Sequence, residues 1–177
     1  RTVEAYLNFG SRGAESYQRV YGKEFLLERV KLFRRWGPEE KQKKLRADSL
    51  YRQARQRKNR GDVRKALPLW QSVLRLYQAI GDRKWEGATL GNLGNAYHVL
   101  SDYRRAIDYH EQALKIAREI GDRSVEGNAL GNLGGAYQAL SDYHRAIDYH
   151  ERALKITREI GDRRGEGAIL GTLGNAY

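Results

Sequence analysis

The sequence of 177 residues has no cysteine, only two prolines and no apolar run long enough to cross a bilayer. The absence of cysteine excludes disulfides, thiol nucleophiles and cysteine-ligated zinc. A membrane-spanning helix would need about 20 consecutive apolar residues. No secretory signal is present either, so we expect the chain to work in the cytoplasm, a reducing compartment.

Signatures of catalysis are also missing from the sequence. It contains no nucleophile elbow, no HExxH motif and no P-loop. The glycines of GNLGNAY and GNLGGAY have GxxG spacing inside an expected helix, without a preceding strand, so they do not form a dinucleotide-binding fingerprint. The four histidines lack the paired spacing of metal ligands. We therefore predict a chain that is not an enzyme and holds no metal and no cofactor.

Positive charge is concentrated in the first half of the chain. The net charge is +11, but residues 1–80 hold 20 Lys or Arg against 8 Asp or Glu, whereas residues 81–177 hold 13 against 14. The second half is therefore close to neutral, and any preference for acidic partners belongs to the first half.

Most of the organisation lies in residues 81–177, which repeat themselves. Gly81, Gly121 and Gly161 open successive copies, which sets the period at 40 residues. Residues 101–120 and 141–160 differ at only three positions. Self-similarity at such a period is typical of stacked supersecondary units.

Each copy contains two segments of helical length. In residues 86–100, and again in residues 102–120, apolar residues recur at spacings of three and four, which predicts one apolar stripe on each helix. The pairs Ser101-Asp102 and Ser141-Asp142 offer N-cap oxygens between the helices. Gly121 suits the left-handed conformation that ends a helix. The unit is therefore predicted to be helix–turn–helix.

The motif Leu90-x-x-Leu93-Gly94-x-x-Tyr97 resembles the signature of the tetratricopeptide repeat (TPR) family. The later copies repeat the motif at Leu130, Leu133, Gly134 and Tyr137, and at Leu170, Leu173, Gly174 and Tyr177. The 40-residue period and the GDRxxEG connector resemble the Pins-type and kinesin-light-chain-like subclass. This resemblance implies an all-α, right-handed α-solenoid of antiparallel helix pairs. His110 and His150 stand where the family usually has Phe, so we expect them to pack between helices.

Superposing the copies predicts the order of the units. Residues 1–46 are a divergent, basic helical region, and residues 47–80 are a degenerate first repeat. Residues 39–60 are predicted to form one long helix in which Leu45, Leu50 and Ala54 face inward. Residues 81–120 and 121–160 are full repeats, and residues 161–177 are the first helix of a further, incomplete repeat. Pro68 predicts a kink or a late start in the second helix of the first repeat. Residues 23–36 form an amphipathic helix that either caps the first repeat or binds a membrane or partner.

The resemblance also implies a function, because TPR proteins hold partner peptides in the concave groove lined by their first helices. Asn amides suit a peptide backbone, and Arg grips carboxylates, so we expect a protein or peptide partner with an acidic end. The predicted groove residues are Arg52, Arg55, Lys58, Asn92, Asn95, His98, Asn128, Asn132, Gln138, Thr172 and Asn175.

Two alternatives to this groove hypothesis stay open. The basic residues of the first repeat are also consistent with an ordinary solvated helix face. Residues 23–65 carry enough positive charge to attract nucleic acid or an anionic membrane, although no nucleic-acid motif accompanies them. The predicted function is therefore a scaffold or adaptor for protein partners, with polyanion binding as the second hypothesis.

Overall fold

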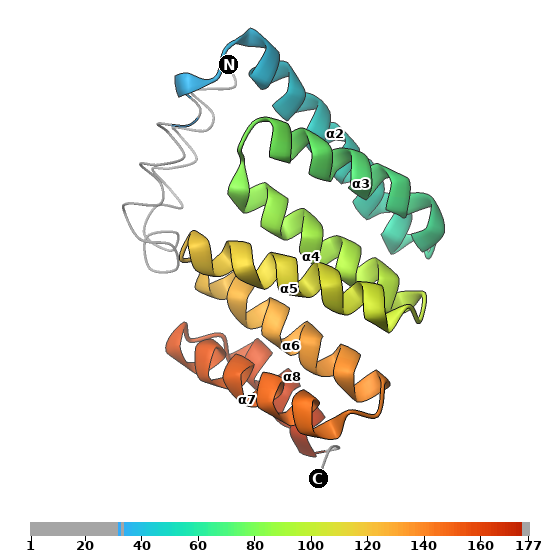
Figure 1. Ribbon diagram of the computed structural model, residues 1–177, viewed down its shortest axis with the longest axis vertical. Helices are drawn as coiled ribbons and strands as arrows, with labels where there is room; N and C mark the ends of the chain where they lie inside the picture. The colour runs from blue at the N-terminus through green and yellow to red at the C-terminus, as the bar shows by residue number, and fades with distance from the viewer. Residues whose placement is uncertain (1–31, 33, 175–177) are drawn as a thin grey trace. The chain divides into compact units, whose positions relative to one another are not determined.

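The computed structural model describes residue 32 and residues 34–174, and every regular element among them is a helix (Figure 1). The chain divides into two units, residues 1–35 and residues 36–177. The helix predicted at residues 23–36 lies almost entirely outside the described residues. The helices of the second unit are α2 (Pro38–Asn59), α3 (Val63–Ala79), α4 (Arg83–Val99), α5 (Tyr103–Glu119), α6 (Arg123–Ala139), α7 (Tyr143–Glu159) and α8 (Arg163–Gly174).

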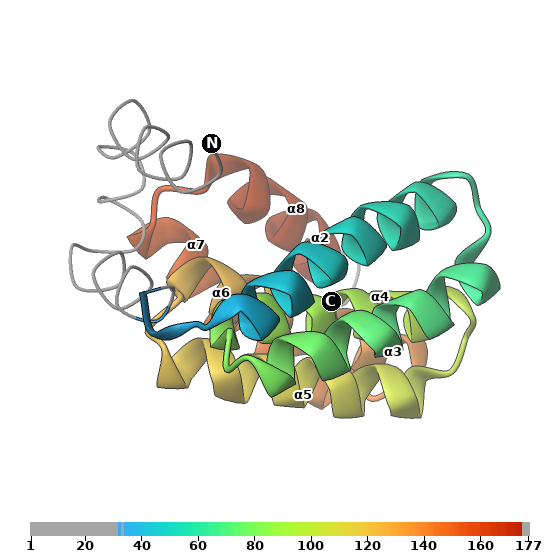
Figure 2. The ribbon, with the colours of Figure 1, turned by 90° about the horizontal axis from the view of Figure 1, so that it is seen from above.

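Each helix of this unit packs against the next one along the chain, and α4 also contacts α6. The first helices of the pairs are α2, α4, α6 and α8, and the second helices are α3, α5 and α7. In Figure 2, α3 and α5 lie below α2 and α4, so the first and second helices of these two pairs lie in different layers. The predicted all-α, right-handed α-solenoid is confirmed for the described residues. Within that part of the chain, each helix is too short or too polar to span a bilayer.

The same three-residue turn links every pair of consecutive helices. After α3, the Gly81 N–H donates to the Gln78 carbonyl (3.1 Å) and the Asp82 N–H donates to the Tyr77 carbonyl (3.0 Å). This is the Schellman pattern, which requires a positive φ at its central residue, and Gly81 has φ +67°. The Asp82 carboxylate then accepts from the Trp85 N–H (3.4 Å) and caps α4. One aspartate therefore closes one helix and starts the next.

Serine takes the glycine position in two of these turns. Ser101 and Ser141 have φ values of 60° and 62°, and the caps are Asp102 and Asp142, whose carboxylates accept from the N–H groups of residues 105 and 145 at 3.2 Å. The prediction of N-cap oxygens is confirmed for the two aspartates and wrong for the two serines. Each serine instead occupies the positive-φ position of the turn, and the following aspartate accepts the capping hydrogen bond.

Replacing Ser101 with glycine is expected to raise the free energy of unfolding by about 0.5–1 kcal/mol. A residue with a Cβ loses roughly 1 kcal/mol or more in the left-handed region, and the greater freedom of glycine in the unfolded chain offsets part of that gain. Urea unfolding followed by circular dichroism measures the change. The matched control is Gly81→Ser, which should lower stability by a similar amount. Equal stability of all three proteins would contradict the expected strain.

Small side chains let the helices of the unit approach closely. Ala106, Ala113, Ala146 and Ala153 are fully buried on the second helices. Of these, Ala113, Ala146 and Ala153 pack with the signature leucines of the first helices, including Leu130 and Leu133, in one continuous core. Close packing of alanine against leucine explains why each copy keeps the same apolar stripe.

The inward face of α2 differs from the prediction. Ala54 is buried, as predicted, and Leu50 is half-buried, but Leu45 is 58% exposed, so its predicted inward position was wrong. Lys44 takes the inward position instead. Its ammonium group lies 5.2 Å from the ring centroids of both Tyr77 and Trp85, which stabilise a cation.

The buried Lys44 also has an acidic partner. Asp48 accepts from the Lys44 ammonium group at 2.5 Å and from the Tyr77 hydroxyl at 2.7 Å. Burial, and then the hydrogen bond to Asp48, raise the pKa of Tyr77. A lysine on the inner face of a helix is therefore paired and enclosed by rings, which hydropathy alone does not reveal.

Pro68 does not delay the second helix of the first repeat. Helix α3 begins at Val63 and continues through Pro68 to Ala79, so the predicted late start was wrong. Proline removes one intrahelical hydrogen bond but does not prevent the turns before it from forming. Trp70 and Ala66 of the same helix are fully buried and hold it in the core.

The two repeated histidines pack between helices, as predicted. His110 is fully buried and His150 nearly so. A Cβ placed on Gly94 would lie 2.5 Å from the ring of His110, and the same holds at 2.6 Å for Gly134 and His150. The signature glycine therefore leaves the space that the aromatic ring of the second helix fills.

Candidate functional site

A cleft of about 350 Å³ separates the first helices of the two full copies. It lies between α4 and α6, with Ala113 of α5 beneath it. Four of the predicted groove residues line the cleft together: Asn92, Asn95, Asn128 and Asn132. Its other lining residues are Gly87, Ala88, Gly91, Val125 and Ala129. The structure thus gathers the amide side chains of two repeats around one hollow.

Two glycines of α4 shape the cleft in different ways. A Cβ on Gly87 would lie 3.1 Å from Ile116, so this glycine lets α5 approach α4. A Cβ on Gly91 would have no atom within 4 Å, so this glycine leaves space open instead. Because glycine inside a helix costs about 1 kcal/mol relative to alanine, packing within the described chain does not account for Gly91.

The four amides have different hydrogen-bonding states. The Asn92 amide nitrogen donates to the Tyr51 hydroxyl (3.0 Å) and to the Ala88 carbonyl (2.9 Å). Its two N–H groups are therefore used, and its carbonyl oxygen is left as an acceptor. Within the described part of the chain, no hydrogen bond engages the side chains of Asn95, Asn128 or Asn132, so these three offer both donors and acceptors to the cleft.

Tyr51 closes the groove toward the first repeat. In the superposed copies it stands where Gly91 stands, and its ring packs edge-on against Trp70 (4.7 Å) and Trp85 (5.1 Å). Burial raises the pKa of Tyr51, although the Asn92 hydrogen bond and Arg55 act in the opposite direction. The hydroxyl is therefore neutral at physiological pH. The space that is open between α4 and α6 is filled by this side chain between α2 and α4.

The three predicted basic residues lie on α2 and do not line the cleft. Arg52 and Arg55 are exposed, and Lys58 is half-buried. No ion pair to another described residue engages any of them. They form a positively charged surface on α2, outside the cleft.

The remaining predicted groove residues are outside the cleft as well. His98 is half-buried and packs edge-on against Tyr103 at 5.2 Å, and Gln138 is half-buried. The Thr172 hydroxyl donates to the Ala168 carbonyl (2.7 Å) on α8. Asn175 lies outside the described residues. The structure therefore brings together four of the eleven predicted residues around the hollow.

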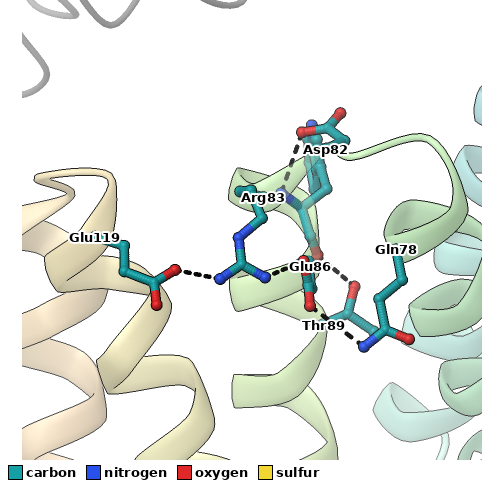
Figure 3. A network of polar contacts seen from close by, with 7 residues as sticks. Gln78, Asp82, Arg83, Glu86, Thr89 and Glu119 are labelled. Carbon is teal, nitrogen blue, oxygen red and sulfur yellow. Dashed lines mark hydrogen bonds and ion pairs between the residues drawn. The ribbon is translucent and has the colours of Figure 1, made fainter.

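A polar network that the sequence analysis did not predict joins the end of α3, the start of α4 and the end of α5 (Figure 3). Arg83 donates to Glu86 (2.8 Å) and to Glu119 at the end of α5, and Gln78 of α3 donates to Glu86 (3.2 Å). The hydrogen bond that Arg83 donates to Glu119 is the main cause that raises the pKa of Arg83. Because Glu86 is buried, these partners are needed to compensate its lost hydration.

The next copy repeats this network with an additional charge. Arg123 donates to Glu126 (2.6 Å) and to Glu159, and Arg118 donates to Glu126 (2.9 Å) in place of Gln78. Each network joins the end of one copy to the start of the next. The GDRxxEG connector was the available signal, since its Arg and Glu share one helix face at a spacing of three.

Comparisons with known proteins agree with this architecture. The sequence model of the family described as tetratricopeptide repeat matches residues 45–119 and 126–177. No curated protein matches the chain. Among solved structures, the TPR domain of FLU from Arabidopsis is 23% identical with a TM-score of 0.64, and the alignment covers 66% of this chain and 98% of that one.

Two further structures are similar over different lengths. A STAND signal-transduction ATPase with a tetratricopeptide repeat sensor, from Pyrococcus horikoshii, is 26% identical with a TM-score of 0.65, and the alignment covers 68% of this chain and 19% of that one. Kinesin-light-chain-like repeats from Podosopora anserina are 20% identical with a TM-score of 0.62, covering 99% and 85%. The chain thus corresponds to a minor part of the Pyrococcus protein.

Proposed function

The chain belongs to the tetratricopeptide repeat family, and from this premise we propose that it is a scaffold or adaptor that holds a partner peptide between α4 and α6. Family membership supports interaction with proteins, and the cleft supports the position of the binding site between α4 and α6. The observation that carries the proposal is the hollow itself, in which Asn95, Asn128 and Asn132 have unused amides above small side chains. We assign this role to the cytoplasm.

An extended segment suits this cleft better than a bulky one. Amides that offer both donors and acceptors match the alternating N–H and C=O groups of a peptide backbone. Gly91 and Ala88 leave room for that backbone to come close to α4. The proposal therefore assigns affinity mainly to main-chain hydrogen bonds, with side-chain selectivity at the two ends of the cleft.

The end of the peptide toward α2 is proposed to be acidic. Arg52 and Arg55 are exposed there, three residues apart on one helix face. A segment that leaves the cleft over Tyr51 would bring a carboxylate within their reach, and Arg binds carboxylates through two parallel hydrogen bonds. Solvated basic residues are the alternative, and charge reversal at these two positions separates the two cases.

The test is selection of binding peptides from a random displayed library, followed by affinity measurement. Gly91→Tyr should abolish binding, because the chain itself shows with Tyr51 that tyrosine fills this position. Asn95→Ala with Asn132→Ala should weaken binding at least tenfold, since each lost hydrogen bond is worth about 1 kcal/mol. Arg52→Glu with Arg55→Glu should weaken only peptides with an acidic end.

A matched control variant is Gln112→Ala on the outer surface of α5, which should bind as the unaltered protein does. Circular dichroism checks that each variant keeps its helices. Unchanged affinity in Gly91→Tyr would show that the selected peptides bind elsewhere and would refute the proposed groove.

A further inference from the structure

Three turns of the solenoid lie along one side of the second unit. They join α2 to α3, α4 to α5, and α6 to α7, and Figure 1 shows them on the right-hand side of the view. We call this side the turn rim and define it by residues 57–65, 97–105 and 137–145. The turns that join α3 to α4, α5 to α6, and α7 to α8 lie on the opposite side.

The two sides differ in charge. The turn rim holds eight Lys or Arg against three Asp, a net charge of +5. The corresponding windows on the opposite side, residues 78–86, 118–126 and 158–166, hold seven Lys or Arg against eight Asp or Glu, a net charge of −1. On that opposite side the charges pair in the networks around Glu86 and Glu126. The rim therefore carries an excess of positive charge that the other side lacks.

Internal pairing compensates the positive charge of the first rim turn only weakly. Asp62 is the one acidic residue in residues 57–65, and it lies 4.0 Å from Arg57 and 3.9 Å from Lys65. The first turn of α3 carries Arg64 and Lys65 without an acidic residue, although the helix dipole favours negative charge there. These cations therefore reduce the stability of the free protein and favour an external anion.

The same rim exposes large apolar side chains. Val99, Leu140 and Tyr143 are 60%, 44% and 50% exposed. Elsewhere in the described part of the chain, Leu45 and Leu170 are the other large hydrophobic residues with comparable exposure. The α4–α5 and α6–α7 turns thus present exposed apolar side chains, whereas the α2–α3 turn presents cations.

The arrangement on this rim points to a flat anionic partner, and we propose that the turn rim docks on the surface of a membrane containing anionic lipid. Cations near such a surface each gain about 1 kcal/mol from the negative headgroups, and exposed aliphatic and tyrosine side chains enter the interface. Nucleic acid would use the cations but leaves Val99 and Leu140 without a role. The combination of one basic turn and two apolar turns along one side therefore favours lipid over nucleic acid.

This site is distinct from the proposed peptide groove. The cleft lies between the first helices α4 and α6, and no residue of the rim lines it. Failure of either proposal therefore leaves the other standing. A protein held by its rim would keep the cleft available for a partner, because the two surfaces use different residues.

The experiment is sedimentation of the full chain with vesicles of phosphatidylcholine alone or with about 30% phosphatidylserine, which gives the vesicle surface a negative potential. Binding is expected only to the anionic vesicles, and it should weaken as the salt concentration rises. Arg60→Glu with Lys65→Glu should reduce binding at least tenfold. Val99→Gln with Leu140→Gln and Tyr143→Gln should also reduce it about tenfold, with less dependence on salt.

Controls match each change by exposure and chemistry. Leu45→Gln with Leu170→Gln alters exposed leucines away from the rim, Lys115→Glu with Lys155→Glu reverses charges on the second helices, and Gly91→Tyr fills the cleft. All three should bind vesicles as the unaltered protein does, with melting curves confirming that every variant is folded. Equal loss in the rim and control variants, or binding to duplex DNA without binding to anionic vesicles, would overturn the proposal.

Discussion

Replacing Gly94 with alanine is expected to lower the free energy of unfolding by about 2–3 kcal/mol, even though alanine is the better helix former. The added Cβ would lie 2.5 Å from the His110 ring, which is fully buried between α4 and α5. Because the ring is fully buried, we expect the added methyl group to push α4 and α5 apart. Chemical denaturation of the variant measures the loss.

The matched control for this change lies one turn earlier on the same helix. Gly91→Ala adds the same methyl group where no atom lies within 4 Å, so stability should rise by about 0.5–1 kcal/mol. A double variant of Gly94→Ala with His110→Ala should be less destabilised than the sum of its single changes, because the clash has been removed. Additive effects would show that the glycine is required for some other reason.

Acidification is expected to destabilise the protein through its buried histidines. Burial lowers the pKa of His110 to about 4, with a smaller effect from His98, and burial also lowers the pKa of His150. The unfolded chain, with an ordinary histidine pKa near 6.5, binds protons first. Stability from these groups is therefore fully present above about pH 6.5 and is lost as the pH falls toward 4, by about 3 kcal/mol for His110 alone.

The variant His110→Phe with His150→Phe isolates this effect. Neither ring nitrogen of either histidine has a hydrogen-bond partner among the described residues, so phenylalanine removes a buried polar group and the titration together. Unfolding at pH 7 and at pH 4.5 should show a much smaller loss in this variant. Arg105 and Arg145 lower the pKa values of Asp102 and Asp142, so protonation of these two aspartates in acid also reduces the stability of the protein. This loss is the same in the unaltered protein and in the variant. An equal acid loss in both would exclude the histidines as its cause.

The sequence predicted the helices because the copies repeat both spacing and turn residues. The spacing of Leu90, Leu93 and Tyr97 fits one face of a helix and does not fit a strand. Because two copies are nearly identical, the same turn residues mark the end of each helix in both. The packing of His110 followed from its place in the repeat. The first repeat was harder, because Lys44 and Tyr51 depart from the pattern that its neighbours follow.

Only part of the candidate site could be predicted from the sequence. Superposition placed Asn92 and Asn132 on corresponding helix faces, and the structure puts both at one cleft. It did not reveal that Tyr51 fills the neighbouring space, since this depends on Trp70 and Trp85 from two other helices. Contacts between residues distant in sequence, such as Asn92 with Tyr51, have no local signal.

The network at Glu126 has a consequence for how such a chain grows. Arg118 comes from one copy, whereas Glu126, Arg123 and Glu159 come from the next. A duplicated block of 40 residues would bring a glutamate equivalent to Glu126, which accepts from the copy before it. It would also bring an arginine equivalent to Arg118, which donates to the copy after it. Insertion or deletion of whole blocks therefore leaves both joints complete, so the gene can change its number of copies without compensating substitutions.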